Sequence, residues 1–171
     1  MNWYKKAQYL EELEAAIPST TLSGIYYHGS LADPNNIFTE LEEGYSDWGA
    51  IWVTDEESMA EEFAKTWHEP EENEIPIVFQ VQVNLNKVAE ISDQNYEWEE
   101  FKDIYAIDDP REAIPHLRQM GYDGWITTGS MGPRAYTDIA IFGGNIQLTH
   151  VKVLKNDPED EWSEWSDWEE V

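Results

Sequence analysis

The segment 77–85 constrains the fold more than any other part of the chain. Its residues read IVFQVQVNL, with an apolar residue at every odd position and amides at three of the four even ones. A period of two predicts a β-strand with one face on the core and the other toward water. Residues 88–91 are apolar enough to extend it. Because a lone strand is not stable, this chain must build a sheet around the segment.

Patterns elsewhere predict helices beside that sheet, and therefore an α+β fold. Apolar residues spaced by three and four predict an amphipathic helix over 2–17, ended by Pro18 and packed on the outside of the domain. A second helix is expected at 110–121, and a third within the acidic, aromatic stretch 93–109. Further short strands are expected at 25–27, 50–53, 124–127, 139–142 and 146–154.

Composition sets the size and the charge of the molecule. A chain of 171 residues with 41% apolar content suits one domain with a substantial core, which we place at 1–155. Ten basic residues stand against 36 acidic ones, a formal net charge of −26. Such a charge disfavours non-specific binding to nucleic acid, because it repels the phosphate backbone, and it suits a basic partner.

Several classes of site and location are disfavoured by the sequence. There is no cysteine for a disulfide or a thiolate metal site, and no histidine spacing favours a metal. The N-terminal segment lacks the apolar run of a signal peptide, and no segment approaches the roughly 20 apolar residues that cross a bilayer. We therefore expect a soluble protein of the cytoplasm, or of a host cytoplasm if the chain is phage-encoded, with no metal and no membrane contact.

The last segment, 156–171, is a tail in which acids surround tryptophans at every third position. Trp162, Trp165 and Trp168 form this series. Two interpretations are open: a disordered acidic arm whose tryptophans dock on a basic partner, or a flap that folds onto the chain's own domain.

The stretch from Gly24 to Phe63 contains the strongest candidate for a functional site. Its first β-prone run ends at 28–30, His-Gly-Ser, where we predict a turn that carries the histidine; the glycine would let the backbone either turn or lie against a ligand. Its second run ends at Thr54, which with Glu57 three residues later forms a predicted capping box. The helix that follows carries Phe63 on its apolar stripe. Two strand ends and one helix can therefore surround a small pocket.

These motifs, together with the acid-led strand 138–142 and the pair 145–146, resemble those of the ADP-ribosyltransferase fold. The resemblance is to the branch of poly-ADP-ribose polymerases and diphtheria toxin, particularly its small phage and bacterial domains. It covers roughly Ser23 to Leu148 in the correct order. It implies a split antiparallel β-sheet core with peripheral helices. It also implies an enzyme that cleaves NAD at the nicotinamide–ribose bond and transfers ADP-ribose to an acceptor, which the sequence does not name.

The resemblance assigns NAD-binding roles to the two strand ends and the helix. His28 would hydrogen-bond the adenosine ribose, the Gly29 backbone would hold the nicotinamide carboxamide, and Ser30 would lie close by. Trp52 stands where the family usually has tyrosine. Trp52 and Phe63 are either aromatic faces that stack on nicotinamide or ordinary core residues.

The catalytic roles fall to Asp138 and His28, with Thr54 in the NAD-binding motif between them. Cleavage of the glycosidic bond builds positive charge on the ribose, which a nearby carboxylate stabilises. The family's acid is usually Glu, and Asp138 is one methylene shorter; it is alternatively a residue that only begins a strand. These departures keep a rival hypothesis open, that of a non-catalytic module of the same fold that engages or inhibits a basic partner.

Overall fold

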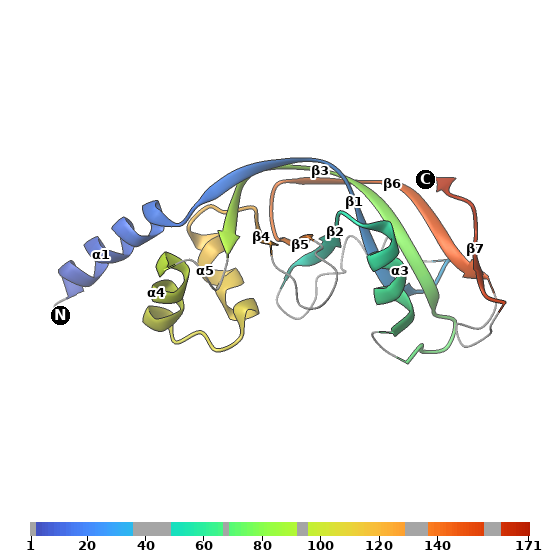
Figure 1. The fold of residues 1–171 in the computed structure, drawn as a ribbon, viewed down its shortest axis with the longest axis horizontal. Helices are drawn as coiled ribbons and strands as arrows, with labels where there is room; N and C mark the ends of the chain where they lie inside the picture. Colours follow the sequence, from blue (N-terminus) through green and yellow to red (C-terminus); the bar gives the residue numbers. More distant parts are fainter. Residues whose placement is uncertain (1–2, 36–48, 67–68, 92–95, 129–136, 156–161) are drawn as a thin grey trace.

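The computed structural model describes residues 3–35, 49–66, 69–91, 96–128, 137–155 and 162–171 (Figure 1). Its fold is mixed α+β with a mostly antiparallel sheet, as the sequence predicts. The elements in chain order are α1 (Trp3–Ala16), β1 (Ser19–Ala32), β2 (Ile51–Thr54), α3 (Glu57–Thr66), β3 (Ile75–Ile91), α4 (Tyr96–Tyr105), the 3₁₀ helix η1 (Pro110–Ala113), α5 (Ile114–Gln119), β4 (Gly124–Thr128), β5 (Thr137–Ile141), β6 (Asn145–Lys155), β7 (Glu164–Trp165) and β8 (Glu169–Glu170).

Strand β3 is the centre of the sheet. It pairs with β1 along one edge, antiparallel. Along its other edge it pairs first with β6, antiparallel, and then with β4, parallel. From β4 the pairings continue through β5 and β2 back to β1, so that five strands form a closed circuit. In Figure 1 the long strands β1, β3 and β6 arch over the three short strands.

The alternation of β3 separates two apolar clusters. From Ile77 to Leu85 its odd-numbered residues, among them Phe79 and Val81, are buried inside the circuit. They pack there with Ile51 and Val53 of β2 and with Ile139 of β5. A second cluster joins the other face of the short strands to α4 and α5; its members include Ala50, Phe101, Ile114, Leu117, Trp125 and Ala140. The short strands are therefore covered on both faces.

Helix α1 has the predicted extent, but its first turn does not pack on the domain. Trp3 is 78% exposed and Tyr4 is 70% exposed. In Figure 1 the helix extends away from the sheet at the N-terminal end. The apolar stripe of this helix thus overstates its contact with the core, while Ile17 just after it is buried in the cluster beneath α4 and α5.

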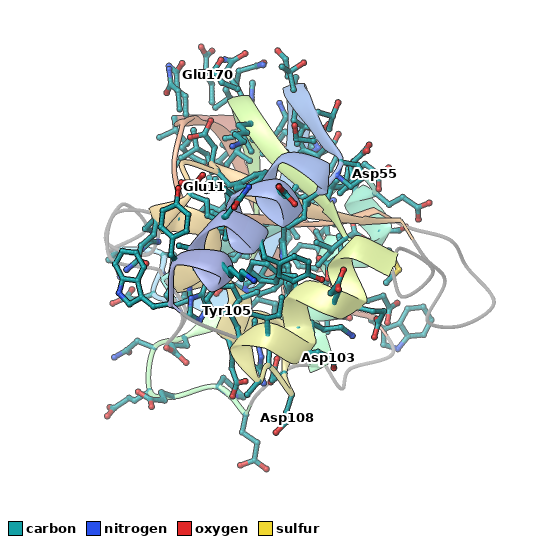
Figure 2. All side chains as sticks on the ribbon, turned by 90° about the vertical axis from the view of Figure 1, so that its left-hand side faces the viewer. Glu11, Asp55, Asp103, Tyr105, Asp108 and Glu170 are labelled. Carbon is teal, nitrogen blue, oxygen red and sulfur yellow. The ribbon has the colours of Figure 1, made fainter. Side chains whose placement is uncertain are left out.

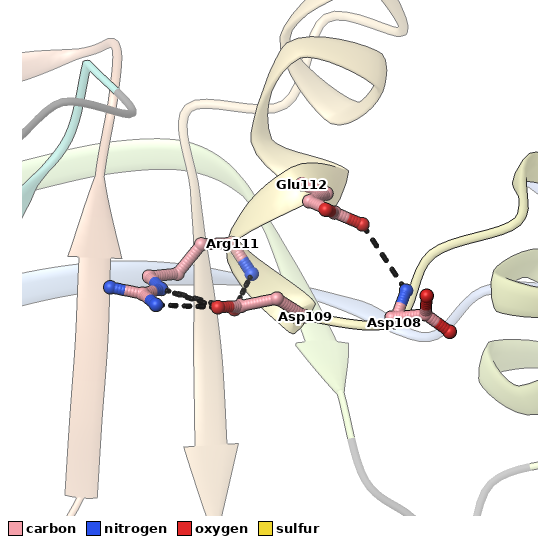
Figure 3. Close-up of polar contacts among 4 residues, drawn as sticks. All are labelled: Asp108, Asp109, Arg111 and Glu112. Carbon is pink, nitrogen blue, oxygen red and sulfur yellow. Dashed lines mark hydrogen bonds and ion pairs between the residues drawn. The ribbon is translucent and has the colours of Figure 1, made fainter.

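The predicted helix over 110–121 consists of η1 followed directly by α5, and a carboxylate caps its start (Figure 3). Asp109 accepts a hydrogen bond from the backbone N–H of Arg111 at 2.9 Å, and both its oxygens accept from Nε of Arg111 at 3.0 Å. Glu112 reaches back to accept from the backbone N–H of Asp108. The hydrogen bonds from Arg111 hold the pKa of Asp109 below its usual value.

Replacing Asp109 by Ala should lower the free energy of unfolding by about 1 kcal/mol, the usual cost of losing an N-cap. Because the pKa of Asp109 is lowered on folding, this stabilisation is present above pH 4 or so and is lost as pH falls through the folded pKa. Denaturant unfolding at pH 7 and at pH 3 measures both effects. Asp108→Ala is the matched control; a loss equal to that of Asp109→Ala would contradict the capping role.

Candidate active site

The candidate site lies on a row of paired residues that crosses four strands. Thr54, the last residue of β2, pairs with Tyr27 of β1 on one side and with Asp138 of β5 on the other. Asp138 pairs in turn with Thr127 of β4. Neighbouring strands lie about 4.8 Å apart, so β1 and Asp138 are separated by about 10 Å. The row places Asp138 two strands from Tyr27, the neighbour of His28 in β1. His28 itself pairs with Phe79, which is buried inside the circuit, so the alternation of β1 turns its side chain to the opposite face from Asp138.

Asp138 is partly buried, and burial raises its pKa from 3.8 to about 6. A hydrogen bond from the backbone N–H of Ile139 acts in the opposite direction, but desolvation outweighs it. Ile139 and Ile141 point into the circuit, so the alternation of β5 places Asp138 on the opposite face with Ala140. A carboxylate with such a perturbed pKa is a mark of functional sites as well as of some structural ones.

His28 lies inside a strand, so the predicted turn at 28–30 is wrong. β1 continues to Ala32 because β3 pairs with every residue from Leu22 to Ala32, including His28 with Phe79. The register between β1 and β2, in contrast, consists of the single pair of Tyr27 with Thr54. Next to that pair, the side chain of His28 in β1 contacts the backbone of β2: its Nδ1 lies 2.6 Å from the carbonyl oxygen of Trp52. Since a carbonyl only accepts, Nδ1 carries the hydrogen.

Gly29 serves close packing rather than a turn. A Cβ built on it would lie 1.8 Å from the backbone oxygen of Ala60, so α3 occupies the space that a side chain would need. Ser30, next along the strand, donates its hydroxyl hydrogen to the carbonyl oxygen of Leu31 at 3.2 Å. Both residues are therefore engaged within β1 and against α3.

The predicted capping box at Thr54 is also wrong in detail. Thr54 is 2% exposed and ends β2, and its hydroxyl accepts from the backbone N–H of Glu56, one residue before α3 begins. The carboxylate of Glu57 does not reach back to the start of the helix. It pairs instead with Lys152 of β6, because β6 brings a cation to this face of the helix.

The two aromatic candidates lie on different elements. Trp52 is partly buried and meets the ring of Trp125 edge-on, with centroids 5.6 Å apart, at the cluster beneath α4 and α5. This contact agrees with the interpretation of Trp52 as a core residue. Phe63 is partly buried on α3, whose sheet-facing residues are Ala60 and Ala64.

Comparisons with protein-family models and with curated proteins found no match to this chain. Within the described ranges, no group of three or more His, Asp or Glu side chains is arranged to hold a metal ion. No described helix is both long and apolar enough to cross a membrane.

Sequence analysis missed one cluster beside the site. Lys152 is buried beneath the C-terminal tail, and its ammonium pairs with Glu57 and Glu61 of α3. The described part of the tail, 162–171, folds back on the domain through β7 and β8, which is the flap interpretation. Two sequence signals were available: a lysine within the short apolar run 151–154 (Val-Lys-Val-Leu), and two glutamates four residues apart on one helix face.

Proposed function

We propose that this protein is an ADP-ribosyltransferase-like enzyme that cleaves NAD, with Asp138 as its catalytic carboxylate. The observation that carries the proposal is Asp138 itself, partly buried with a pKa near 6, on the paired row that runs through Thr54 to β1, the strand that contains His28. The motifs that resemble the ADP-ribosyltransferase fold support it, as does a sheet whose strands β1 and β2 share the single pair of Tyr27 with Thr54, next to His28. On the same grounds we propose that the fold is of the ADP-ribosyltransferase type.

The chemistry that suits this arrangement is substitution at the ribose C1′ of NAD. The C1′–nitrogen bond breaks, and nicotinamide leaves with the bonding electron pair. An acceptor hydroxyl, amine or water then forms the new bond to C1′ and releases its proton to solvent. The ribose is cationic in between, and the ionised form of Asp138 stabilises it. Because that form dominates only above about pH 6, cleavage should weaken as pH falls through that value.

The test is release of nicotinamide from NAD by the purified protein, alone and with cell lysate to supply an acceptor. We expect Asp138→Ala to lower release by about 100-fold or more, as loss of an electrostatic stabiliser does elsewhere. His28→Ala should also lower it, and His28→Asn should retain more activity, because its amide still donates toward the Trp52 carbonyl. Asp103→Ala, which removes an exposed acid, is the control for charge alone.

A second candidate function is a non-catalytic module for a basic partner. The formal charge of −26 favours it. Figure 2 views the molecule from the end at which α1 lies. It shows the labelled acids Glu11, Asp55, Asp108 and Glu170 on several sides of the molecule. Intact protein that neither releases nicotinamide nor gains thermal stability with NAD would refute the enzyme and favour this alternative. Binding to a basic protein that weakens with salt would then support it.

A further inference from the structure

Lys152 is a buried cation with two acidic partners on another element. Its side chain is 5% exposed, and its ammonium hydrogen-bonds both Glu57 and Glu61. These glutamates stand four residues apart on α3 and therefore share one face of the helix. Since Lys152 belongs to β6, its ammonium connects α3 to β6, the strand that pairs with β3.

The C-terminal tail closes over this ammonium. The rings of Trp165 and Trp168 have their centroids 5.3 and 4.9 Å from Nζ of Lys152, within the range of a cation–π contact. Ser166 fixes the segment between them: its N–H donates to Val153 at 2.8 Å, and its hydroxyl accepts from the N–H of Val153 at 3.0 Å. The tail is thus seated by directional contacts on both sides of the lysine.

The tail contacts β1 and Lys152 contacts α3, and both of these elements adjoin the candidate site. Trp168 lies against Tyr27 of β1, with ring centroids 6.0 Å apart, and Tyr27 is the residue that pairs with Thr54. Helix α3 follows Thr54 closely, and the backbone of its Ala60 lies against Gly29. A shift of α3 or of Tyr27 would therefore move the residues of β1 and β2 that the proposed function assigns to NAD binding.

We infer that Lys152 and residues 162–171 form a C-terminal latch that positions α3 and β1 for NAD binding. Lys152 is a positioning residue, because it acts through Glu57, Glu61 and the two tryptophans. Without its charge, two carboxylates four residues apart repel each other, the ring of Trp168 loses its contact with Lys152, and Trp165 keeps only the more distant Lys65, 5.8 Å from its centroid. This inference rests on the proposed function as far as NAD is concerned. The contacts of Lys152 with Glu57 and Glu61 of α3 do not depend on the proposed function.

The experiment compares Lys152→Met with Lys152→Arg in the full-length chain, by hydrogen exchange and by NAD kinetics. Lys152→Met should speed amide exchange in α3 by about tenfold or more, because local opening becomes easier. It should raise the KM for NAD about tenfold while kcat stays within about twofold, the pattern of lost ground-state binding. Lys152→Arg keeps the charge, so its amide exchange in α3 and its KM for NAD should lie much closer to those of the original protein.

Trp162→Ala is the matched control within the tail, because Trp162 is 77% exposed while Trp165 and Trp168 pack on the domain. It should leave α3 exchange and KM unchanged. If Lys152→Met does not fold, Trp168→Leu replaces it, with the same expected directions. Unchanged α3 exchange overturns the latch, and faster exchange with an unchanged KM overturns its positioning role. If the intact protein cleaves no NAD, the proposed function fails, and α3 exchange still decides whether the latch exists.

Discussion

Asp138→Asn is expected to make the protein more stable at neutral pH and, at the same time, unable to cleave NAD. The folded protein raises the pKa of Asp138 to about 6, which means that ionising this carboxylate costs stability. The amide of Asn is uncharged, and its oxygen can still accept from the N–H of Ile139. A catalytic carboxylate held at such a cost is the stability–activity trade-off expected of an active site.

The sign of the pH dependence follows from the direction of the shift. A folded-state pKa above the unfolded value means that the folded protein binds this proton more tightly, so stability is lost as pH rises from about 4 to about 6. The full shift corresponds to about 3 kcal/mol, and partial exposure reduces the expected gain to about 1 to 2 kcal/mol. Below pH 4 the Asn variant and the original protein should be equally stable.

Denaturant unfolding of both proteins from pH 4 to pH 8 measures the difference. Asp103→Asn is the control, since it removes one negative charge from an exposed position and should give a small difference that changes little with pH. A stability difference for Asp138→Asn that does not grow between pH 4 and pH 6 would show that burial does not raise this pKa. Retained nicotinamide release would remove Asp138 from catalysis.

The main strands and helices could be predicted from sequence because each has a local pattern. The alternation of β3 and the Pro-to-Gly helix at 110–121 depend on their own residues and on the difference between a buried and a wet face. The same reasoning failed at 28–30, where glycine after a strand suggested a turn. There the pairing of β1 with β3 continues, and the need for glycine comes from Ala60 of α3, 31 residues away in sequence.

The candidate site, like the fold, could be predicted from sequence only in part. The residue types at His28, Thr54 and Asp138 could be selected from motifs, but their arrangement depends on register. That Thr54 pairs with both β1 and β5 is a property of three strands far apart in the chain. The buried Lys152 illustrates the limit most clearly, because its burial requires α3, β6 and the tail to meet.

Gly29→Ala is expected to destabilise the protein by about 3 kcal/mol, the upper part of the usual range for overpacking. The new methyl carbon would lie 1.8 Å from the oxygen and 2.7 Å from the carbonyl carbon of Ala60. Both are backbone atoms of α3, so no side-chain rotation relieves the clash, and the helix must move off the sheet. Denaturant unfolding measures the loss, and hydrogen exchange should show it first in α3.

Gly24→Ala is the informative comparison, because it separates space from backbone conformation. Gly24 has a φ of +147° and its nearest neighbour would be 3.7 Å from a Cβ, so alanine there is strained but not crowded. Gly29 has no positive φ, and its cost is steric alone. Gly29→Ala should therefore disturb α3 selectively, whereas Gly24→Ala should leave α3 exchange unchanged. A Gly29→Ala variant of normal stability would mean that α3 does not lie against β1 at this point, and the positioning of the candidate site by α3 would fall with it.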